Sequence, residues 1–271
     1  MKIFAVRDES DPTRRDVAYL LYYEQAKRFY IELPENADPW STPLLLSSFL
    51  KKGERTVNAY WSKLWVQQRI VPPDRQNLGQ ILKANHLASY DEFDLLMLAD
   101  GRCAQDDYYL APIPEADLPK SFVERFQKKV EDVIPLEQYQ LLLFFRDGIV
   151  KKFNMNSHFL TEKAFSPILK NKALFDSVAI QPGGYGICWG ETLTIADAVL
   201  YDQGSEIPLS QSDFERFVTF RIVNTAEAAE LLHCSRQNID DLVRRGKLHP
   251  VKATFKNKLF MKSEIIQRSW K

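Results

Sequence analysis

Short apolar segments typical of β-strands open the chain. Lys2–Arg7 alternates between apolar and polar residues, and Val17–Tyr23 and Arg28–Leu33 are rich in Tyr, Val and Ile with a short polar link between them. The last two segments predict an antiparallel hairpin. Tyr108–Ala111 predicts a further strand, which ends at a proline-containing boundary.

Between these strands the apolar positions recur at helical spacing, and Gly or Pro residues mark where the helices stop. The predicted helices, with their predicted N-caps, are 44–51 after Ser41 or Thr42, 57–70 after Thr56, 75–84 after Asp74, and a short helix after Ser89 or Asp91. Residues 1–118 are therefore expected to form a mixed α+β domain.

The pattern changes near residue 134 to strands joined by tight turns. Asp147-Gly148 separates the apolar runs Tyr139–Phe145 and Ile149–Phe153, and this dipeptide supplies the positive φ angles of a two-residue hairpin turn. The other predicted elements are helices over 121–132, 194–201 and 213–221, and a second hairpin that joins 178–180 to 185–189. Residues 133–205 are expected to form a small α+β domain.

Gly183-Gly184 could suggest a phosphate-binding loop, but its surroundings favour a simple turn. Neither a GxxxxGK[ST] nor a GxGxxG pattern surrounds the pair, and a strand is predicted on either side of it. His158 has no carboxylate or nucleophile nearby with which it could form a catalytic pair. The middle segment therefore offers no candidate active site.

The last fifty residues predict two helices joined by a short turn. Thr225 can cap the first helix, in which Ala228 and Ala229 belong to an apolar face that lets a second helix cross closely. Ser235 can cap a second helix over Arg236–Arg245, and Gly246 supplies the left-handed residue that ends it. Residues 248–251 then lead into a strand, followed by a wing hairpin over 255–260 and a last helix over 264–270 capped by Ser263.

This arrangement suits DNA. A helix fits the major groove, where Arg and Gln or Asn side chains recognise guanine and adenine edges, while lysines of a wing contact the backbone. The predicted DNA-contacting residues are Ser235, Arg236, Gln237, Asn238, Arg244, Arg245, Lys252, Lys256, Asn257 and Lys258.

The C-terminal segment resembles the excisionase-like and MerR-like winged helix-turn-helix family of bacteria and phages. The motifs that carry the resemblance are Thr225–Leu232, Ser235–Ile239, Leu242–Leu248 and Lys262–Ile265, with matching spacing over about 45 residues. The resemblance implies a winged helix-turn-helix fold over residues 222–271 and binding to double-stranded DNA. Two departures are a wing that carries lysines instead of arginines and the acidic pair Asp240-Asp241 in the reading helix.

The middle segment resembles a small, uncharacterised α+β domain family of bacteria that is often found beside helix-turn-helix modules. The resemblance rests on the apolar run from Tyr139 with its Asp-Gly turn, on Phe165–Leu169, and on Gly183-Gly184-Tyr185 through Trp189. It implies a fold but no activity.

Charge is distributed unevenly along the chain. The whole chain carries 36 Lys and Arg and 36 Asp and Glu, whereas residues 221–271 carry 11 basic and 5 acidic residues, a net charge of +6. The remainder is therefore acidic, with a net charge of −6. A basic C-terminal segment on an acidic body favours an anionic partner for that segment.

Composition favours a multi-domain α+β protein of the cytoplasm. No apolar run is long enough to cross a membrane, the N-terminus lacks a signal peptide, and the chain of 271 residues has room for two or three domains. Three cysteines, Cys103, Cys188 and Cys234, lie far apart without metal-ligand spacing and indicate a reducing compartment.

Residues 1–115 contain acidic residues that a metal-dependent nuclease could use. Asp106 and Asp107 stand out beside Asp91, Glu92 and Asp94, but carboxylates at 91–94 are also what a helix N-terminus prefers. We therefore expect no metal, no cofactor and no catalytic residue.

Further residues of this segment have two interpretations. Trp61 and Trp65, four residues apart on one predicted helix, are expected in the core, with a ligand or partner surface as the alternative. Arg69, Arg75 and Arg102 could bind an anionic effector but are expected in surface salt bridges.

The sequence thus favours a bacterial or phage transcriptional regulator that is not an enzyme and that binds double-stranded DNA as a homodimer on two-fold sites or on tandem sites. Its first two domains would sense an effector, dimerise or recruit a protein. Three alternatives stay open: an excisionase-like architectural recombination factor, an enzyme targeted by its C-terminal module, and a protein-interaction adaptor.

Overall fold

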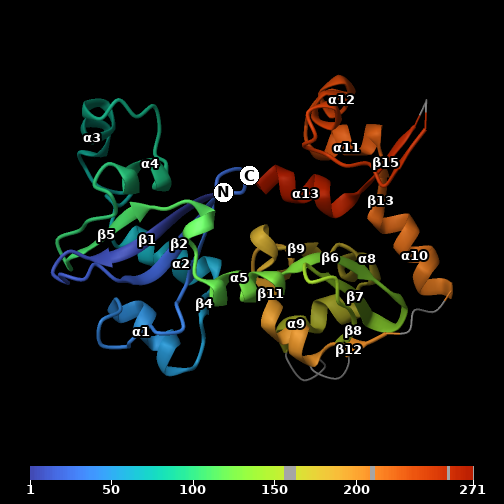
Figure 1. The fold of residues 1–271 in the computed structure, drawn as a ribbon, viewed down its shortest axis with the longest axis horizontal. Coiled ribbons are helices and arrows are strands. Elements are labelled where there is room, and N and C mark those ends of the chain that lie inside the picture. Colours follow the sequence, from blue (N-terminus) through green and yellow to red (C-terminus); the bar gives the residue numbers. More distant parts are fainter. Residues whose placement is uncertain (156–162, 208–210, 255–256, 271) are drawn as a thin grey trace. The chain divides into compact units, whose positions relative to one another are not determined.

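The computed structural model describes residues 1–155, 163–207, 211–254 and 257–270. The chain divides into two compact units, residues 1–123 and 124–271, which are described separately. The first unit holds a five-stranded sheet with helices, and the second holds several smaller sheets with helices, so the protein is a multi-domain α+β protein (Figure 1).

The first unit is built on an antiparallel sheet with the strand order β4-β3-β2-β1-β5. Its strands are β1 (Lys2–Asp8), β2 (Asp16–Tyr23), β3 (Arg28–Glu32), β4 (Thr56–Val57) and β5 (Tyr108–Pro112). Its helices are α1 (Leu44–Lys51), α2 (Ala59–Gln67), α3 (Leu78–Ala84), α4 (Glu92–Met97) and the 3₁₀ turn η1 (Glu115–Asp117), and α5 (Lys120–Gln127) crosses into the second unit. The predicted hairpin and the strand before the proline boundary are confirmed.

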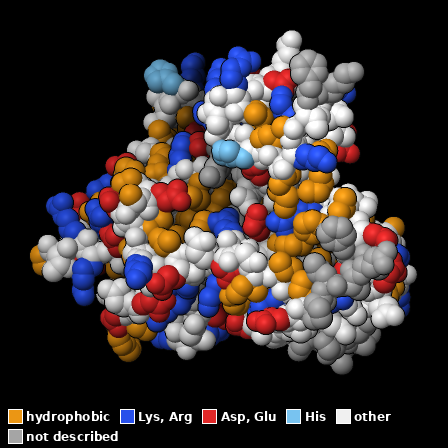
Figure 2. All heavy atoms as spheres, turned by 45° about the vertical axis from the view of Figure 1, so that its right-hand side comes forward, with side chains coloured by type: hydrophobic (Ala, Val, Ile, Leu, Met, Phe, Trp, Pro, Cys, Tyr) orange, Lys and Arg blue, Asp and Glu red, His pale blue; other side chains and the backbone are white. Residues whose placement is uncertain are grey.

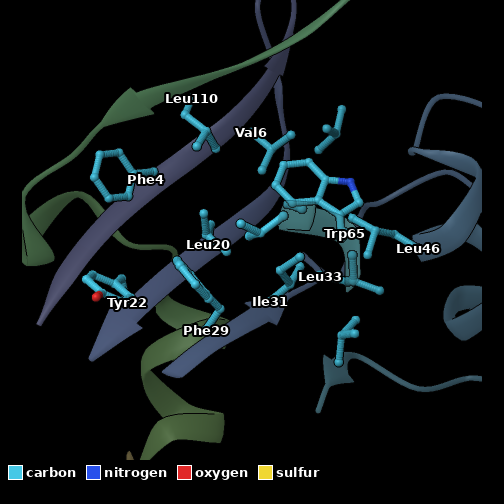
Figure 3. Packing of buried hydrophobic residues seen from close by; sticks show 14 of the residues in the cluster. Phe4, Val6, Leu20, Tyr22, Phe29, Ile31, Leu33, Leu46, Trp65 and Leu110 are labelled. Carbon is cyan, nitrogen blue, oxygen red and sulfur yellow. The ribbon is translucent and has the colours of Figure 1, made fainter. Parts of the chain in front are cut away.

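Apolar side chains on one face of this sheet form the core of the unit, which Figure 3 shows from close by. Trp65 of α2 is 2% exposed and lies among Val6, Leu33 and Leu46. Tyr22 stacks on Phe93 of α4 with ring centroids 4.2 Å apart. Helices α2 and α4 therefore cover the sheet face through aromatic side chains.

Two predicted helix starts in this unit are wrong, whereas α1 begins and ends where the sequence predicts. Thr56 lies in β4, and Asn58 caps α2 by accepting a hydrogen bond from the Trp61 amide at 3.1 Å. Val57 pairs with Ile31 across the sheet, so tertiary pairing overrides the helical pattern there. Helix α3 starts after Asn77 instead of Asp74. For α1 only the predicted cap at Ser41 or Thr42 is wrong, because the helix follows Pro43 and no side chain caps it.

The described residues of the second unit form three sheets, with the strand orders β12-β8-β7-β6, β11-β10-β9 and β13-β15-β14. Its strands are β6 (Val130–Pro135), β7 (Gln140–Phe145), β8 (Val150–Asn154), β9 (Ala179–Ile180), β10 (Gly186–Trp189), β11 (Leu193–Ala196), β12 (Ser205–Glu206), β13 (Ile222–Asn224), β14 (Lys252–Ala253) and β15 (Lys258–Met261).

The helices of this unit connect and cover the sheets. They are α7 (Ser166–Lys170), α8 (Lys172–Asp176), α9 (Asp197–Gln203), α10 (Gln211–Arg221), α11 (Thr225–Leu231), α12 (Arg236–Arg244) and α13 (Lys262–Trp270), with the 3₁₀ turns η2 (Glu137–Tyr139), η3 (Lys163–Phe165) and η4 (Pro182–Gly184).

Both predicted hairpins of the middle segment are confirmed, because β7 pairs with β8 and β9 pairs with β10, each antiparallel. Two predicted helices are partly wrong. Val130 opposite Phe145 begins β6 where a helix to Asp132 was expected. Leu193–Ala196 is strand β11, which pairs with β10 and buries Ile195, so the helix starts only at Asp197.

The four-stranded sheet buries apolar side chains on both faces. One face packs on α7, α8 and α9 through a cluster that includes Phe153, Phe175 and Trp189. The other face buries Leu142 and Phe144 against α10, the predicted helix that leads to the C-terminal segment. Since α10 runs directly into β13, this packing connects the middle sheet to the C-terminal module.

Candidate nucleic-acid interface

The first helix of the C-terminal module, α11, is held by a capping box. The Asn224 side chain accepts hydrogen bonds from the amides of Ala226 and Glu227, at 2.8 and 3.1 Å. Glu227 Oε2 in return accepts the Asn224 amide at 2.7 Å. The cap is thus Asn224 and not the predicted Thr225, which is the first residue of the helix. Both observed partners lie three residues apart, as this motif requires.

A tight turn separates α11 from α12. His233 adopts a positive φ of 50°, and the Cys234 amide donates a hydrogen bond back to the Ala229 carbonyl oxygen at 2.9 Å. The Ser235 side chain then accepts the Asn238 amide at 3.2 Å, which confirms Ser235 as the cap of α12. Ala228 and Ile239 are fully buried where the two helices meet. The small residue allows the close crossing that the sequence predicts.

Strands β14 and β15, which follow α12, are called the wing below. Gly246 takes the predicted left-handed conformation, with a φ of 63°. Strand β15 pairs with β14 on one side and with β13 on the other, and β13 comes from before the two helices. The Thr254 hydroxyl donates a hydrogen bond to the Asn257 carbonyl oxygen and accepts one from the Asn257 amide. Lys256, a predicted DNA contact, lies outside the described residues.

A groove of about 770 Å³ lies between the start of α12 and the wing. Its lining residues come from the starts of α11 and α12 and from both wing strands; they are Asn224, Thr225, Ala226, Arg236, Asp240, Lys252, Thr254, Asn257, Lys258 and Leu259. Figure 2 shows Lys and Arg side chains at the top of the C-terminal module. The groove is thus polar, with basic side chains from three elements.

Four of the predicted contacts, Arg236, Lys252, Asn257 and Lys258, line this one groove although the sequence separates them by up to 22 positions. The other predicted contacts that the structure describes do not line it. They are exposed residues at the start and end of α12: Ser235, Gln237, Asn238, Arg244 and Arg245.

Carboxylates of α12 pair with two of the predicted contacts. Asp240 Oδ1 lies 2.5 Å from Lys258 Nζ, so a side chain of α12 meets one of the wing inside the groove. Asp241 Oδ1 lies 2.7 Å from Arg244 Nη2, one turn along the same helix. In the sequence, Asp240 and Asp241 stand out only as an acidic departure from the family pattern. The pairing of Asp240 with the wing depends on tertiary structure and was missed.

A buried charge cluster links the middle sheet to the C-terminal module. The Arg221 guanidinium lies 3.6 Å from Glu131, 3.9 Å from Asp132 and over the Phe144 ring. The Ser263 hydroxyl lies 3.3 Å from the Glu131 carboxylate, so α13 also contacts β6. The predicted cap at Ser263 is wrong, because α13 already begins at Lys262. Asp132 is 5% exposed.

Burial and charge act in opposite directions on these groups. Burial raises the pKa of Asp132 to about 6, although the attraction of Arg221 partly opposes it. Burial also lowers the pKa of Arg221 from its ordinary value, against the attraction of the two carboxylates. Burial has the larger effect on the pKa of both groups, so the charged form of each group costs free energy in the folded protein.

In the first unit, the candidate acidic residues have structural partners. Asp106 accepts two hydrogen bonds from the Arg69 guanidinium, at 2.9 and 2.6 Å, and Arg69 stacks over Trp65. The hydrogen bonds and charge of Arg69 lower the pKa of Asp106, although burial has the opposite effect. Asp91 caps α4 as predicted and pairs with Lys27. Among the described residues, no three His, Cys, Asp or Glu side chains are placed to bind one metal ion.

The two tryptophans of α2 differ in their surroundings. Trp65 is in the core, as predicted. Trp61 was also expected in the core, but this expectation is wrong, because its side chain is 39% exposed. It meets Phe49 edge-on with ring centroids 6.1 Å apart, and the neighbouring Tyr60 is mostly exposed. Arg102 forms the surface salt bridges expected for it, with Glu9 and Asp100. The same expectation is wrong for Arg69, whose salt bridge with Asp106 is formed by a buried guanidinium.

The Gly183-Gly184 pair forms a turn packed on β6, as predicted. Gly184 has a φ of 79°, and a Cβ atom there would lie 2.3 Å from the Val130 carbonyl oxygen. Glycine at 184 is therefore required by this close approach. His158 lies outside the described residues.

Comparison with known families supports the expectation for the middle segment. Residues 130–206 match the model of a family described as "Protein of unknown function (DUF2442)". Comparisons with curated proteins and with solved structures gave no match. No helix among the described residues is long and apolar enough to cross a membrane.

Proposed function

We propose that the protein is a DNA-binding transcriptional regulator whose C-terminal residues 222–271 form a winged helix-turn-helix module of the excisionase-like and MerR-like type. In this proposal α12 enters the major groove and the wing contacts the sugar–phosphate backbone. The observation that carries the proposal is the groove between α12 and the wing, into which Arg236, Lys252 and Lys258 converge from three elements.

The chemistry of the exposed residues supports this function. Arg236, Gln237 and Asn238 occupy the first turn of α12 and are exposed, where they can reach base edges. Lys252 and Lys258 flank them on the wing, where they can neutralise phosphates. The net charge of +6 over residues 221–271 favours the same polyanionic partner.

One copy of this module offers one short helix and a two-stranded wing. Such a module buries less surface than tight and specific recognition of DNA needs. We therefore propose a homodimer on a two-fold site or on tandem sites, acting in the cytoplasm. The first unit and the middle segment, which matches the DUF2442 family, would sense an effector, dimerise or recruit a protein.

The test measures binding of the full-length protein to fluorescent duplexes of random sequence and, after selection, to the enriched sequence. Replacing Arg236 and Gln237 together by Ala should lower affinity for the enriched duplex by roughly tenfold or more, because one good base contact is worth about 1–3 kcal/mol. Gln267 and Arg268 of α13 supply a control pair with the same residue types, away from the groove. Their double Ala variant should bind within about twofold of the wild type.

Equal affinity of the wild type and the Arg236/Gln237 variant would show that α12 does not read DNA. Loss of affinity in both double variants alike would show only a general charge effect.

A further inference from the structure

The groove between α12 and the wing contains a carboxylate at a place where a DNA-binding surface would be expected to be basic. Asp240 is the one acidic residue among the described residues that line it. It lies one helical turn after Arg236, on the same side of α12. Its Oδ1 atom is 2.5 Å from Lys258 Nζ of β15.

This ion pair is accessible. The Asp240 side chain is 47% exposed and the Lys258 side chain 31% exposed, so both groups face the groove and not a closed core. An exposed pair of this kind contributes little to folding and exchanges partners readily. A backbone phosphate that enters the groove carries the same charge as the carboxylate and presents the same kind of oxygen acceptors to an ammonium group.

We propose that Asp240 pairs, in the free protein, with Lys258, the lysine that a DNA phosphate binds in the complex. This pairing limits the affinity of a single module for any duplex. This inference rests on the proposed function and extends it to the control of affinity. A phosphate binds Lys258 only by displacing Asp240, whose charge then stays in the groove beside the DNA backbone.

The penalty is electrostatic and does not depend on base sequence. It should therefore lower affinity for every duplex by a similar factor and leave the ratio between specific and random sequences unchanged. A module of such low affinity benefits most from a second copy on the same DNA, because the second binding event is then intramolecular and raises the overall affinity.

The decisive variant is Asp240→Asn, which keeps the size of the side chain and removes its charge. Affinity of the full chain should rise about fivefold at low salt, from the removal of one charge about 4 Å from a phosphate. The plot of log affinity against log salt should become steeper by about 0.9, the value for one more neutralised phosphate charge, because the Lys258–phosphate contact is then no longer offset by the Asp240 carboxylate. Both changes should be equal for the enriched and the random duplex.

Two controls separate this effect from others. Glu230→Gln removes one negative charge from α11, at an exposed position that does not line the groove, and should change affinity by less than about twofold. Asp240→Glu keeps the charge and should keep the low wild-type affinity. Thermal unfolding of each variant checks that the module is folded.

The outcomes are distinguishable. Unchanged affinity and salt dependence in Asp240→Asn, with the wild type binding DNA, overturn this inference and leave the proposed function standing. Weaker binding of the enriched duplex alone would make Asp240 a base-reading residue and also overturn it. If neither protein binds any duplex, the proposed function and this inference both fail.

Discussion

The buried carboxylate of Asp132 predicts an unusual dependence of stability on pH. In the folded protein its pKa is about 6 because of burial, compared with an ordinary value of 3.8. The folded state therefore holds a proton that the unfolded chain has released between these two pH values. Stability of residues 124–271 should fall as the pH rises from about 4 to 6 and change no further through this group above that window.

The magnitude follows from the two pKa values. At about 1.4 kcal/mol for each pH unit, the difference between 3.8 and about 6 amounts to about 3 kcal/mol at pH 7 and above. Asp132 is 5% exposed, so solvent screens little of this cost. Asp132→Asn keeps the shape of the side chain and removes the titration. Its free energy of unfolding should therefore rise by that amount relative to the wild type as the pH rises.

Urea unfolding of the full chain, measured in small steps from pH 4 to pH 8 for both proteins, gives the difference in the free energy of unfolding at each pH. Contributions from all other titrating groups largely cancel in this difference. A difference that does not vary with pH would refute the reasoning. A wild type that gains stability over Asp132→Asn as the pH rises would show that attraction by Arg221 outweighs burial.

Three further predictions concern the same unit and are tested by chemical denaturation. Ile239→Ala should destabilise it by roughly 2–5 kcal/mol, because Ile239 is fully buried between α11 and α12; a loss below this range would contradict the packing. Asn224→Ala should lower the free energy of unfolding by about 1 kcal/mol, because the capping box is lost, and Thr225→Ala should lower it clearly less. The reverse order would show that Thr225 is the cap. Gly184→Ala should lower the free energy of unfolding by roughly 1–3 kcal/mol more than Gly148→Ala. Both glycines have a positive φ, but only at Gly184 would an added Cβ atom meet backbone, the Val130 carbonyl oxygen; equal losses of stability would contradict this close approach.

Elements specified by local patterns could be predicted from the sequence. The hairpin around Asp147-Gly148 was predictable because that dipeptide matches a two-residue turn between apolar runs. Ser235 as a cap and Gly246 as a terminator were predictable because each acts within a few residues of itself.

Features that depend on distant partners could not be predicted. Strand β13 exists because Ile222 pairs with Met261, which is 39 positions away, and β4 exists because Val57 pairs with Ile31. The sequence predicts a helix that includes Val57 and no element at 222–224, since such short segments have no strand pattern of their own. Caps were misplaced where two capping residue types stand side by side, as at Asn224-Thr225.

The candidate interface was predictable in its residue types and only partly in its geometry. Basic and amide residues after Ser235 and in the wing were identified from sequence, and four of them line one groove. The contact of Asp240 with Lys258 depends on how the wing approaches α12. Pairing of this kind depends on side-chain distances, which the sequence does not contain.

The most direct test of DNA recognition by the C-terminal module is selection of bound duplexes from a random-sequence pool by the full-length protein at a stated salt concentration. We expect an enriched sequence, present as two half-sites in two-fold or tandem arrangement, whose enrichment disappears when Arg236 and Gln237 are both replaced by Ala. A pool without any enriched sequence after repeated selection would contradict it.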